Sequence, residues 1–168
     1  MDAAAHHGRS PRIVGGQEAS PHAYPFVLSL REYSQHICGA ALVSATWVVT
    51  AAHCITPSLW EPTSRYSVGV QRHDISLPAA TDGECAEDIE IAEIKRHPAY
   101  NTETMVNDIC LLRLSQIPRC ASRMEMPVLD AGGSSTAGTL ARVAGWGEVR
   151  PALLCTSNET PTDTASDP

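Results

Sequence analysis

The chain has 168 residues, a length that suits one domain or slightly more. Its 12 basic and 19 acidic residues give a formal net charge of −7, which argues against a nucleic-acid partner because such partners need basic surfaces. The longest mostly apolar stretch, residues 39–52, is too short and too rich in serine and threonine to cross a bilayer, so we expect no membrane insertion.

Polar residues 1–12 predict a flexible arm at the start of the chain. Short apolar segments of strand length follow, bounded by Gly, Pro, Ser and Asn: residues 26–30, 37–43, 47–50, 66–71, 89–95, 109–114 and 140–146. In the fifth segment Ile94 breaks the alternation of Ile89 and Ile91, which indicates a β-bulge. Strands this short and frequent predict an all-β sandwich or barrel. Polar residues 155–168 predict a disordered tail.

The number of cysteines is even, as a disulfide framework requires, although sequence alone leaves their pairing open. Scattered reduced cysteines of a cytosolic protein are the alternative, and no CxxC spacing supports a zinc site. The N-terminus has an acid where a signal peptide has a base, and no apolar stretch follows it. Either the protein is not secreted or its true start lies upstream.

A histidine, His53, stands just beyond the end of the third predicted strand. Two alanines before it let the backbone pack closely, and Cys54 would pin the turn if it were bridged. Cys38 begins the preceding strand, where a hairpin could bring it opposite, and closing that loop would stabilise the fold by about 3 kcal/mol. A lone histidine is more often structural than catalytic, so a role in chemistry requires a partner.

Asp108 offers that partner, because it stands directly before the apolar strand 109–114. A carboxylate at the edge of a core is costly unless it is hydrogen-bonded, and a histidine ring N–H is a suitable donor. The alternative is an aspartate that merely ends a turn, and the Asn107–Asp108 pair alone favours that alternative.

Several motifs that occur in order decide between these alternatives. They are Ile13-Val14-Gly15-Gly16 after Arg12, Tyr24-Pro25, Cys38-Gly39, Thr50-Ala51-Ala52-His53-Cys54, His97-Pro98, Asn107-Asp108-Ile109 and Gly145-Trp146-Gly147. Together these motifs resemble the trypsin/chymotrypsin family of serine endopeptidases, over about residues 12–150. The resemblance implies a double β-barrel with the active site between the barrels, and a protease domain, incomplete, over residues 13–154.

The resemblance assigns catalytic roles to the two candidates. His53 matches the general base that takes a proton from a serine hydroxyl, and Asp108 matches the buried acid that orients it. Thr50 matches a position where the family often has a hydroxyl that hydrogen-bonds the acid. The expected activity is peptide-bond hydrolysis on protein or peptide substrates, without a cofactor.

The resemblance also concerns activation and compartment. The Arg12–Ile13 bond matches the zymogen cleavage site, which implies an activating protease, and Arg12 ends the propeptide-like arm. Cys38 and Cys54 match the disulfide beside the histidine. Such a bridge needs an oxidising compartment, so we expect an extracellular or secretory-pathway protein whose signal peptide is missing from this sequence.

The serine of a trypsin-like triad follows the acid along the chain, but the 168 residues of this sequence contain no Gly-Asp-Ser-Gly-Gly. Residues 132–135 lack the acid before the serine and predict a loop. We therefore expect a complete first barrel, a largely missing second barrel and little activity from this chain alone. A truncated or mis-spliced version of a longer protease is the favoured explanation. A non-catalytic pseudoprotease binding module is one alternative, and a complementing chain that supplies the second barrel is the least favoured one.

Two further regions depart from the family pattern. The calcium loop would fall near residues 71–87, where Arg72 replaces the usual glutamate, so we expect a solvated acidic loop and no metal. Four cysteines have no assigned partner, and their pairing stays open: Cys85, Cys110, Cys120 and Cys155.

Overall fold

The computed structural model describes residues 18–55, 63–129, 140 and 142–147. Its regular elements are strands and single 3-10 turns, and no α-helix occurs in this part of the chain, which confirms the all-β prediction. The strands are β1 (Val27–Glu32), β2 (Gln35–Leu42), β3 (Trp47–Thr50), β4 (Tyr66–Val70), β5 (Glu87–Arg96) and β6 (Cys110–Leu114). The turns are η1 (Ala52–Cys54), η2 (Thr63–Arg65), η3 (Ala79–Thr81) and η4 (Ala121–Arg123).

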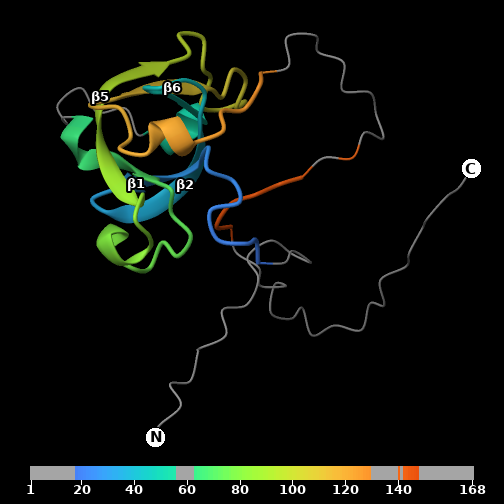
Figure 1. Cartoon of the computed structure of the whole chain (residues 1–168). Coiled ribbons are helices and arrows are strands. Elements are labelled where there is room, and N and C mark those ends of the chain that lie inside the picture. Colours follow the sequence, from blue (N-terminus) through green and yellow to red (C-terminus); the bar gives the residue numbers. More distant parts are fainter. Residues whose placement is uncertain (1–17, 56–62, 130–139, 141, 148–168) are drawn as a thin grey trace, which may run out of the picture. The chain divides into compact units, whose positions relative to one another are not determined.

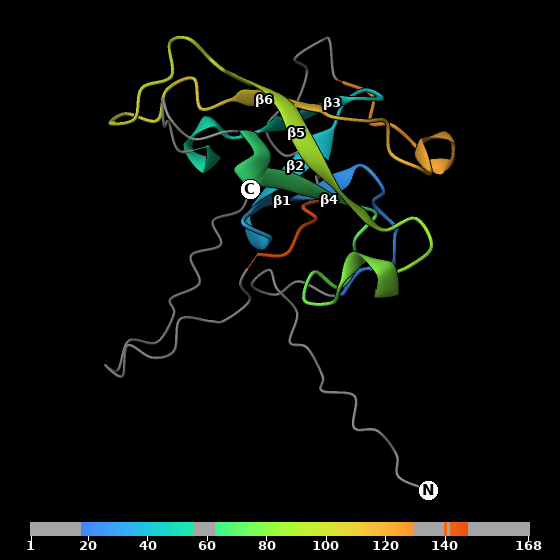
Figure 2. The ribbon, with the colours of Figure 1, turned by 90° about the vertical axis from the view of Figure 1, so that its left-hand side faces the viewer.

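The strands form one closed barrel in the order β1-β2-β3-β6-β5-β4 (Figures 1 and 2). All neighbouring strands are antiparallel, and β4 closes the barrel by pairing with β1, where Ser29 faces Gly69. Closure leaves none of these strands with an unpaired edge. This barrel is the first barrel that the resemblance implies, and residues Glu18–Trp146 form one compact unit around it.

Strand β5 shows how the sequence pattern produces the curvature. Ile89 and Ile91 point into the core between exposed neighbours, as period-two alternation requires. The pairing with β6 then shifts register between Ile91 and Glu93, which confirms the predicted bulge. After the shift, Ile94 packs against the core again. A bulge bends and twists a strand, so this irregularity helps the sheet to close.

Apolar side chains from all six strands fill the barrel. Removing each of them from water contributes about 1.5–3 kcal/mol, which makes this core the main source of stability. At Gly69 the backbone of β4 passes so close to its neighbours that an added Cβ would lie 2.9 Å from Arg72 Cγ. The largest fully buried side chains include Leu28, Leu30, Leu42, Val48, Val68, Val70, Ile89, Leu112 and Leu114.

The prediction of a seventh strand, over residues 140–146, is wrong. Of these residues the structure describes 140 and 142–146, and none is in a strand. Leu140 and Val143 are 98% and 80% exposed. The six strands already close the barrel, so this apolar segment finds no free edge with which to pair. Trp146 is held differently, because its indole donates a hydrogen bond to the His73 carbonyl at 2.9 Å.

The loop between β4 and β5 also differs from the prediction of a solvated acidic loop. The Arg72 side chain is fully buried, and its guanidinium bonds Asp82 at 2.9 Å and Asp88 at 3.0 Å. The Asp82 side chain is only 4% exposed, whereas Glu84 is exposed. A buried carboxylate needs a charged or hydrogen-bonding partner, and Arg72 meets that need from within the chain.

A second disulfide joins Cys85, just before β5, to Cys120, just before η4, with a Cα–Cα distance of 5.6 Å. Cys110 is a free, buried thiol. Cys155, the arm 1–12, the loop 132–135 and the tail 155–168 lie outside the described residues. Within the described part of the chain, no helix has the length and apolar character that crossing a membrane demands.

Candidate active site

His53 lies on the short turn that follows β3. The strand ends at Thr50, Ala51 continues in an extended conformation, and η1 begins at Ala52. On this turn Ala52 and Cys54 are buried while the side chain of His53 is 49% exposed. The small alanines let the turn sit on the barrel core, so the imidazole is presented outward from a fixed backbone.

Asp108 is brought to the histidine by the pairing of β3 with β6. Thr50 faces Cys110 in this antiparallel ladder, so the residues just after β3 lie beside those just before β6. Asn107 adopts a left-handed conformation with φ of 59°. Its side-chain amide nitrogen, Nδ2, donates a hydrogen bond to the Ala99 carbonyl at 2.9 Å. This turn leads the chain into β6 with Asp108 facing the histidine.

Both carboxylate oxygens of Asp108 bond to His53. The ring Nδ1 lies 2.6 Å from Oδ2, and the backbone N–H of His53 donates to Oδ1 at 2.8 Å. The side-chain bond from His53, followed by backbone bonds from His53 and Ala52, holds the pKa of Asp108 below its usual value. The ionised Asp108 accepts a hydrogen bond from Nδ1–H of His53. In the neutral ring the free lone pair then lies on Nε2.

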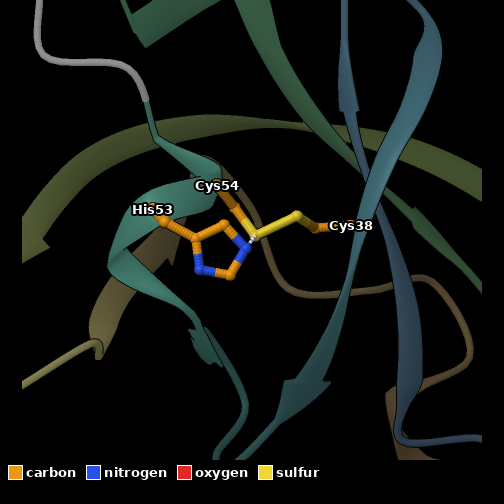
Figure 3. A group of neighbouring side chains, drawn as sticks. All are labelled: Cys38, His53 and Cys54. Atoms are coloured by element: carbon orange, nitrogen blue, oxygen red, sulfur yellow. Dashed lines mark hydrogen bonds between the residues drawn. A yellow bond between two sulfur atoms is a disulfide. The ribbon is translucent and has the colours of Figure 1, made fainter. Parts of the chain in front are cut away.

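A disulfide between Cys38 on β2 and Cys54 on η1 lies beside the imidazole, with a Cα–Cα distance of 6.2 Å (Figure 3). The Sγ of Cys54 lies 3.5 Å from His53 Nε2. Closing a loop of this length stabilises a fold by about 3 kcal/mol in the chain-entropy model. The bridge therefore ties the histidine-bearing turn to the neighbouring strand.

The prediction that the Thr50 hydroxyl hydrogen-bonds Asp108 is wrong. The Thr50 hydroxyl donates instead to the Gly39 carbonyl on β2, at 2.9 Å. A hydroxyl has a single hydrogen to donate, and the buried Thr50 gives it to the backbone of β2 rather than to Asp108. Its role is to hold β3 against β2, one residue from Cys38.

The residues of the predicted site fall into two groups. His53, Asp108, Cys38 and Cys54 come together, whereas the Arg12–Ile13 bond lies outside the described residues. Sequence reasoning missed the backbone N–H of His53 as the second donor to Asp108. It also missed the turn-forming role of Asn107, although an asparagine before the acid is a usable signal because asparagine tolerates positive φ.

A serine–histidine contact occurs on the barrel wall, away from His53 and Asp108 in the sequence. The Ser29 hydroxyl lies 2.8 Å from Nδ1 of His36. Ser29 is fully buried, so a substrate carbonyl has no access to its oxygen. This pair therefore supplies no nucleophile, and His53 with Asp108 remains the candidate for proton transfer.

The structure thus has a closed antiparallel barrel that carries, just beyond the end of β3, a histidine whose ring is oriented by an aspartate. The family model described as Trypsin matches residues 13–162, and the chain belongs to the trypsin family. This assignment agrees with the resemblance seen in the motifs.

Individual relatives are similar over the same region. The chain is 38% identical to human Serine protease 57 over 140 residues, which cover 82% of this chain and 47% of that protein. It is 36% identical to rat Serine protease 57 over 139 residues, covering 82% and 48%. It is 34% identical to a Xenopus laevis trypsin over 136 residues, covering 81% and 50%. The chain thus spans about half the length of these curated relatives.

Proposed function

We propose that this chain carries the general base and the orienting acid of a serine-type endopeptidase. The observation that carries the proposal is the double contact of Asp108 with His53, through Nδ1 at 2.6 Å and through the backbone N–H at 2.8 Å. Two contacts to one carboxylate fix both the position and the rotation of the imidazole. Membership of the trypsin family supports the same chemistry.

In this proposal His53 Nε2 accepts the proton of a serine hydroxyl as that oxygen attacks the peptide carbonyl. The same nitrogen then gives the proton to the leaving amine. Asp108 holds the hydrogen on Nδ1 and stabilises the imidazolium that forms between these steps. The exposed imidazole and the lowered pKa of Asp108 support these roles.

We propose that the nucleophile is supplied by a longer form of the protein. The 168 residues contain no Gly-Asp-Ser-Gly-Gly, and they span about half the length of the relatives. We propose that the longer form provides the serine, the oxyanion-hole amides and the pocket that selects substrates. The 168-residue chain alone then hydrolyses no peptide or ester, because no acyl-transfer step is left to assist.

Activation and compartment complete the proposal. Cleavage of the Arg12–Ile13 bond by another protease would convert the longer form to its active state, with protein or peptide substrates. Two disulfides are what an oxidising compartment produces, which supports an extracellular or secretory-pathway location.

The experiment is to express the longer form, cleave it after Arg12, confirm Ile13 as the new N-terminus, and measure peptide hydrolysis. We expect His53→Ala and Asp108→Asn to reduce kcat/KM by a factor on the order of 10⁴, whereas His97→Ala leaves it unchanged. Activity that survives in both site variants would refute the assignment. Covalent labelling of the 168-residue chain by a fluorophosphonate would refute its inactivity.

A non-catalytic binding module is the second candidate. The observation that favours it is the exposure of apolar side chains after β6, where Val128 and Leu140 are 96% and 98% exposed. Exposed apolar surface marks either a binding site or a tendency to aggregate. A soluble monomer that unfolds cooperatively at micromolar concentration would support the module, and persistent aggregation would argue against it.

A further inference from the structure

The loop between β5 and β6 carries Asp108 near its end. The antiparallel ladder of these strands pairs Arg96 with Cys110, and the backbone N–H of His97 extends it by donating to the Ile109 carbonyl at 3.0 Å. A hairpin that continued straight beyond this bond would keep the next residue beside β5. The chain must therefore leave the hairpin at Asp108 for its carboxylate to face the turn that follows β3.

Asn107 makes the chain leave the hairpin at this point. Its backbone is left-handed, with φ of 59°, and its carbonyl accepts a hydrogen bond from the Ile109 N–H at 2.8 Å. This bond closes a three-residue γ-turn with Asp108 at its centre. On the side-chain side, Nδ2 of Asn107 donates to the Ala99 carbonyl at 2.9 Å and so holds the two arms of the loop together where the ladder has stopped.

We propose that Asn107 is a positioning residue for the acid–base pair: its left-handed backbone turns Asp108 toward His53, and its side-chain amide anchors that turn to Ala99. The placement must be accurate, because the bonds of 2.6 and 2.8 Å from His53 to the carboxylate are lost if Asp108 moves by about 1 Å. The inference deepens the proposed function, since it concerns the same pair. Its geometry exists in the 168-residue chain whether or not a peptide is hydrolysed.

The tautomer of His53 reports whether the turn holds Asp108 in place. While the carboxylate accepts from the ring, the hydrogen of the neutral imidazole is on Nδ1, and without that acceptor the ring is free to carry it on Nε2. Nitrogen NMR of isotopically labelled histidine distinguishes the two forms, and the spectrum of His53→Ala identifies the signals of this ring. A substitution that only lowered the stability of the barrel would leave the tautomer of the folded chain unchanged.

The test compares variants of the folded, disulfide-intact 168-residue chain at alkaline pH. Asn107→Gly keeps the left-handed backbone and loses only the amide bond, so it should largely retain the Nδ1–H form of the parent. Asn107→Ala loses both, and the cost of a left-handed alanine should lower the ratio of the Nδ1–H to the Nε2–H form by about 5- to 30-fold. Met105→Ala is the matched control, because Met105 has a φ of 57° in the same loop but takes no part in the turn at Asp108, so the parent tautomer should persist.

Three outcomes would overturn the proposal: the parent tautomer in Asn107→Ala, loss of the Nδ1–H form in Asn107→Gly, or a change in Met105→Ala as large as in Asn107→Ala. The second outcome decides the matter even where Asn107→Ala does not fold. In the activated longer form, Asn107→Ala should lower kcat by the same factor and leave KM nearly unchanged, because the residue acts through Asp108. An inactive longer form would contradict the proposed function, whereas the tautomer would still decide the role of Asn107.

Discussion

Replacing Arg72 with methionine should destabilise the barrel by about 3 kcal/mol. The guanidinium lies fully buried in the loop between β4 and β5, where it bonds Asp82 at 2.9 Å and Asp88 at 3.0 Å. It also donates to the carbonyls of Asp74 and Leu77. Methionine fills a similar volume but provides no charge and no donor. The variant therefore leaves two carboxylates and two backbone carbonyls without the guanidinium that they bond.

The magnitude follows from what remains around Asp82. Removing one partner of a buried ion pair typically costs about 3–5 kcal/mol, because the other charge stays buried. Asp82 keeps two backbone hydrogen bonds at 2.9 Å, from the amides of His73 and Asp74, and Asp88 keeps its contact with Arg31 at 3.2 Å. These remaining bonds place the expected loss near the lower end of that range.

Urea unfolding of the disulfide-intact chain measures the effect as a change in midpoint at constant slope. Arg123→Met is the matched control, because the Arg123–Glu84 pair is 3.6 Å apart and 66% and 83% exposed, and exposed pairs contribute about 0–1 kcal/mol. Adding Asp82→Asn to Arg72→Met should recover part of the loss by removing the unpaired charge. A cost for Arg72→Met no greater than for Arg123→Met, or no recovery in the double variant, would refute the argument.

Three further predictions concern single side chains. The hydrogen bond from the His53 side chain holds the pKa of Asp108 below its usual value, so the contribution of this contact to stability is present above the unfolded pKa and is lost as pH falls through the lower, folded pKa. In a plot of urea midpoint against pH, Asp108→Asn should therefore flatten the acid limb. Burial raises the pKa of the Cys110 thiol to about 11, so little reactive thiolate is present at pH 8 in the native chain. Iodoacetamide at pH 8 should therefore leave Cys110 unmodified in the native chain and alkylate it in urea, which peptide mass mapping measures. Leu112→Ala should cost about 2–5 kcal/mol in urea unfolding, whereas Leu111→Ala, at a 38% exposed position of the same strand, should cost far less.

The strands were predictable because burial on one face leaves a period-two pattern in the sequence. Ile89 and Ile91 alternate with acids, and the displaced Ile94 indicated the bulge that the pairing of β5 with β6 contains. Six of the seven predicted segments are strands, with ends displaced by a few residues. Apolar content alone did not predict residues 140–146 correctly, because a strand also requires a partner edge.

The loop network was not predictable because it depends on contacts that local sequence does not encode. The acids after β4 appeared solvated, yet Asp82 is buried against Arg72, ten positions earlier in the chain. The pairing of Cys85 with Cys120 depends likewise on how the chain returns after β6. Thr50 matched a family position, but its bonding was decided by the nearest acceptor, the Gly39 carbonyl on the adjacent strand.

The candidate site depends on the register of two strands, which neither motif contains. His53 and Asp108 are 55 positions apart, and they meet because Thr50 faces Cys110 across β3 and β6. A slip of one residue would turn the core side chains of β6 outward and move Asp108 by about 3.4 Å, enough to break both bonds to His53. The buried Leu112 and Leu114 oppose such a slip, because it would expose them to water. The packing of the barrel core thus holds the geometry of a site that lies at its rim.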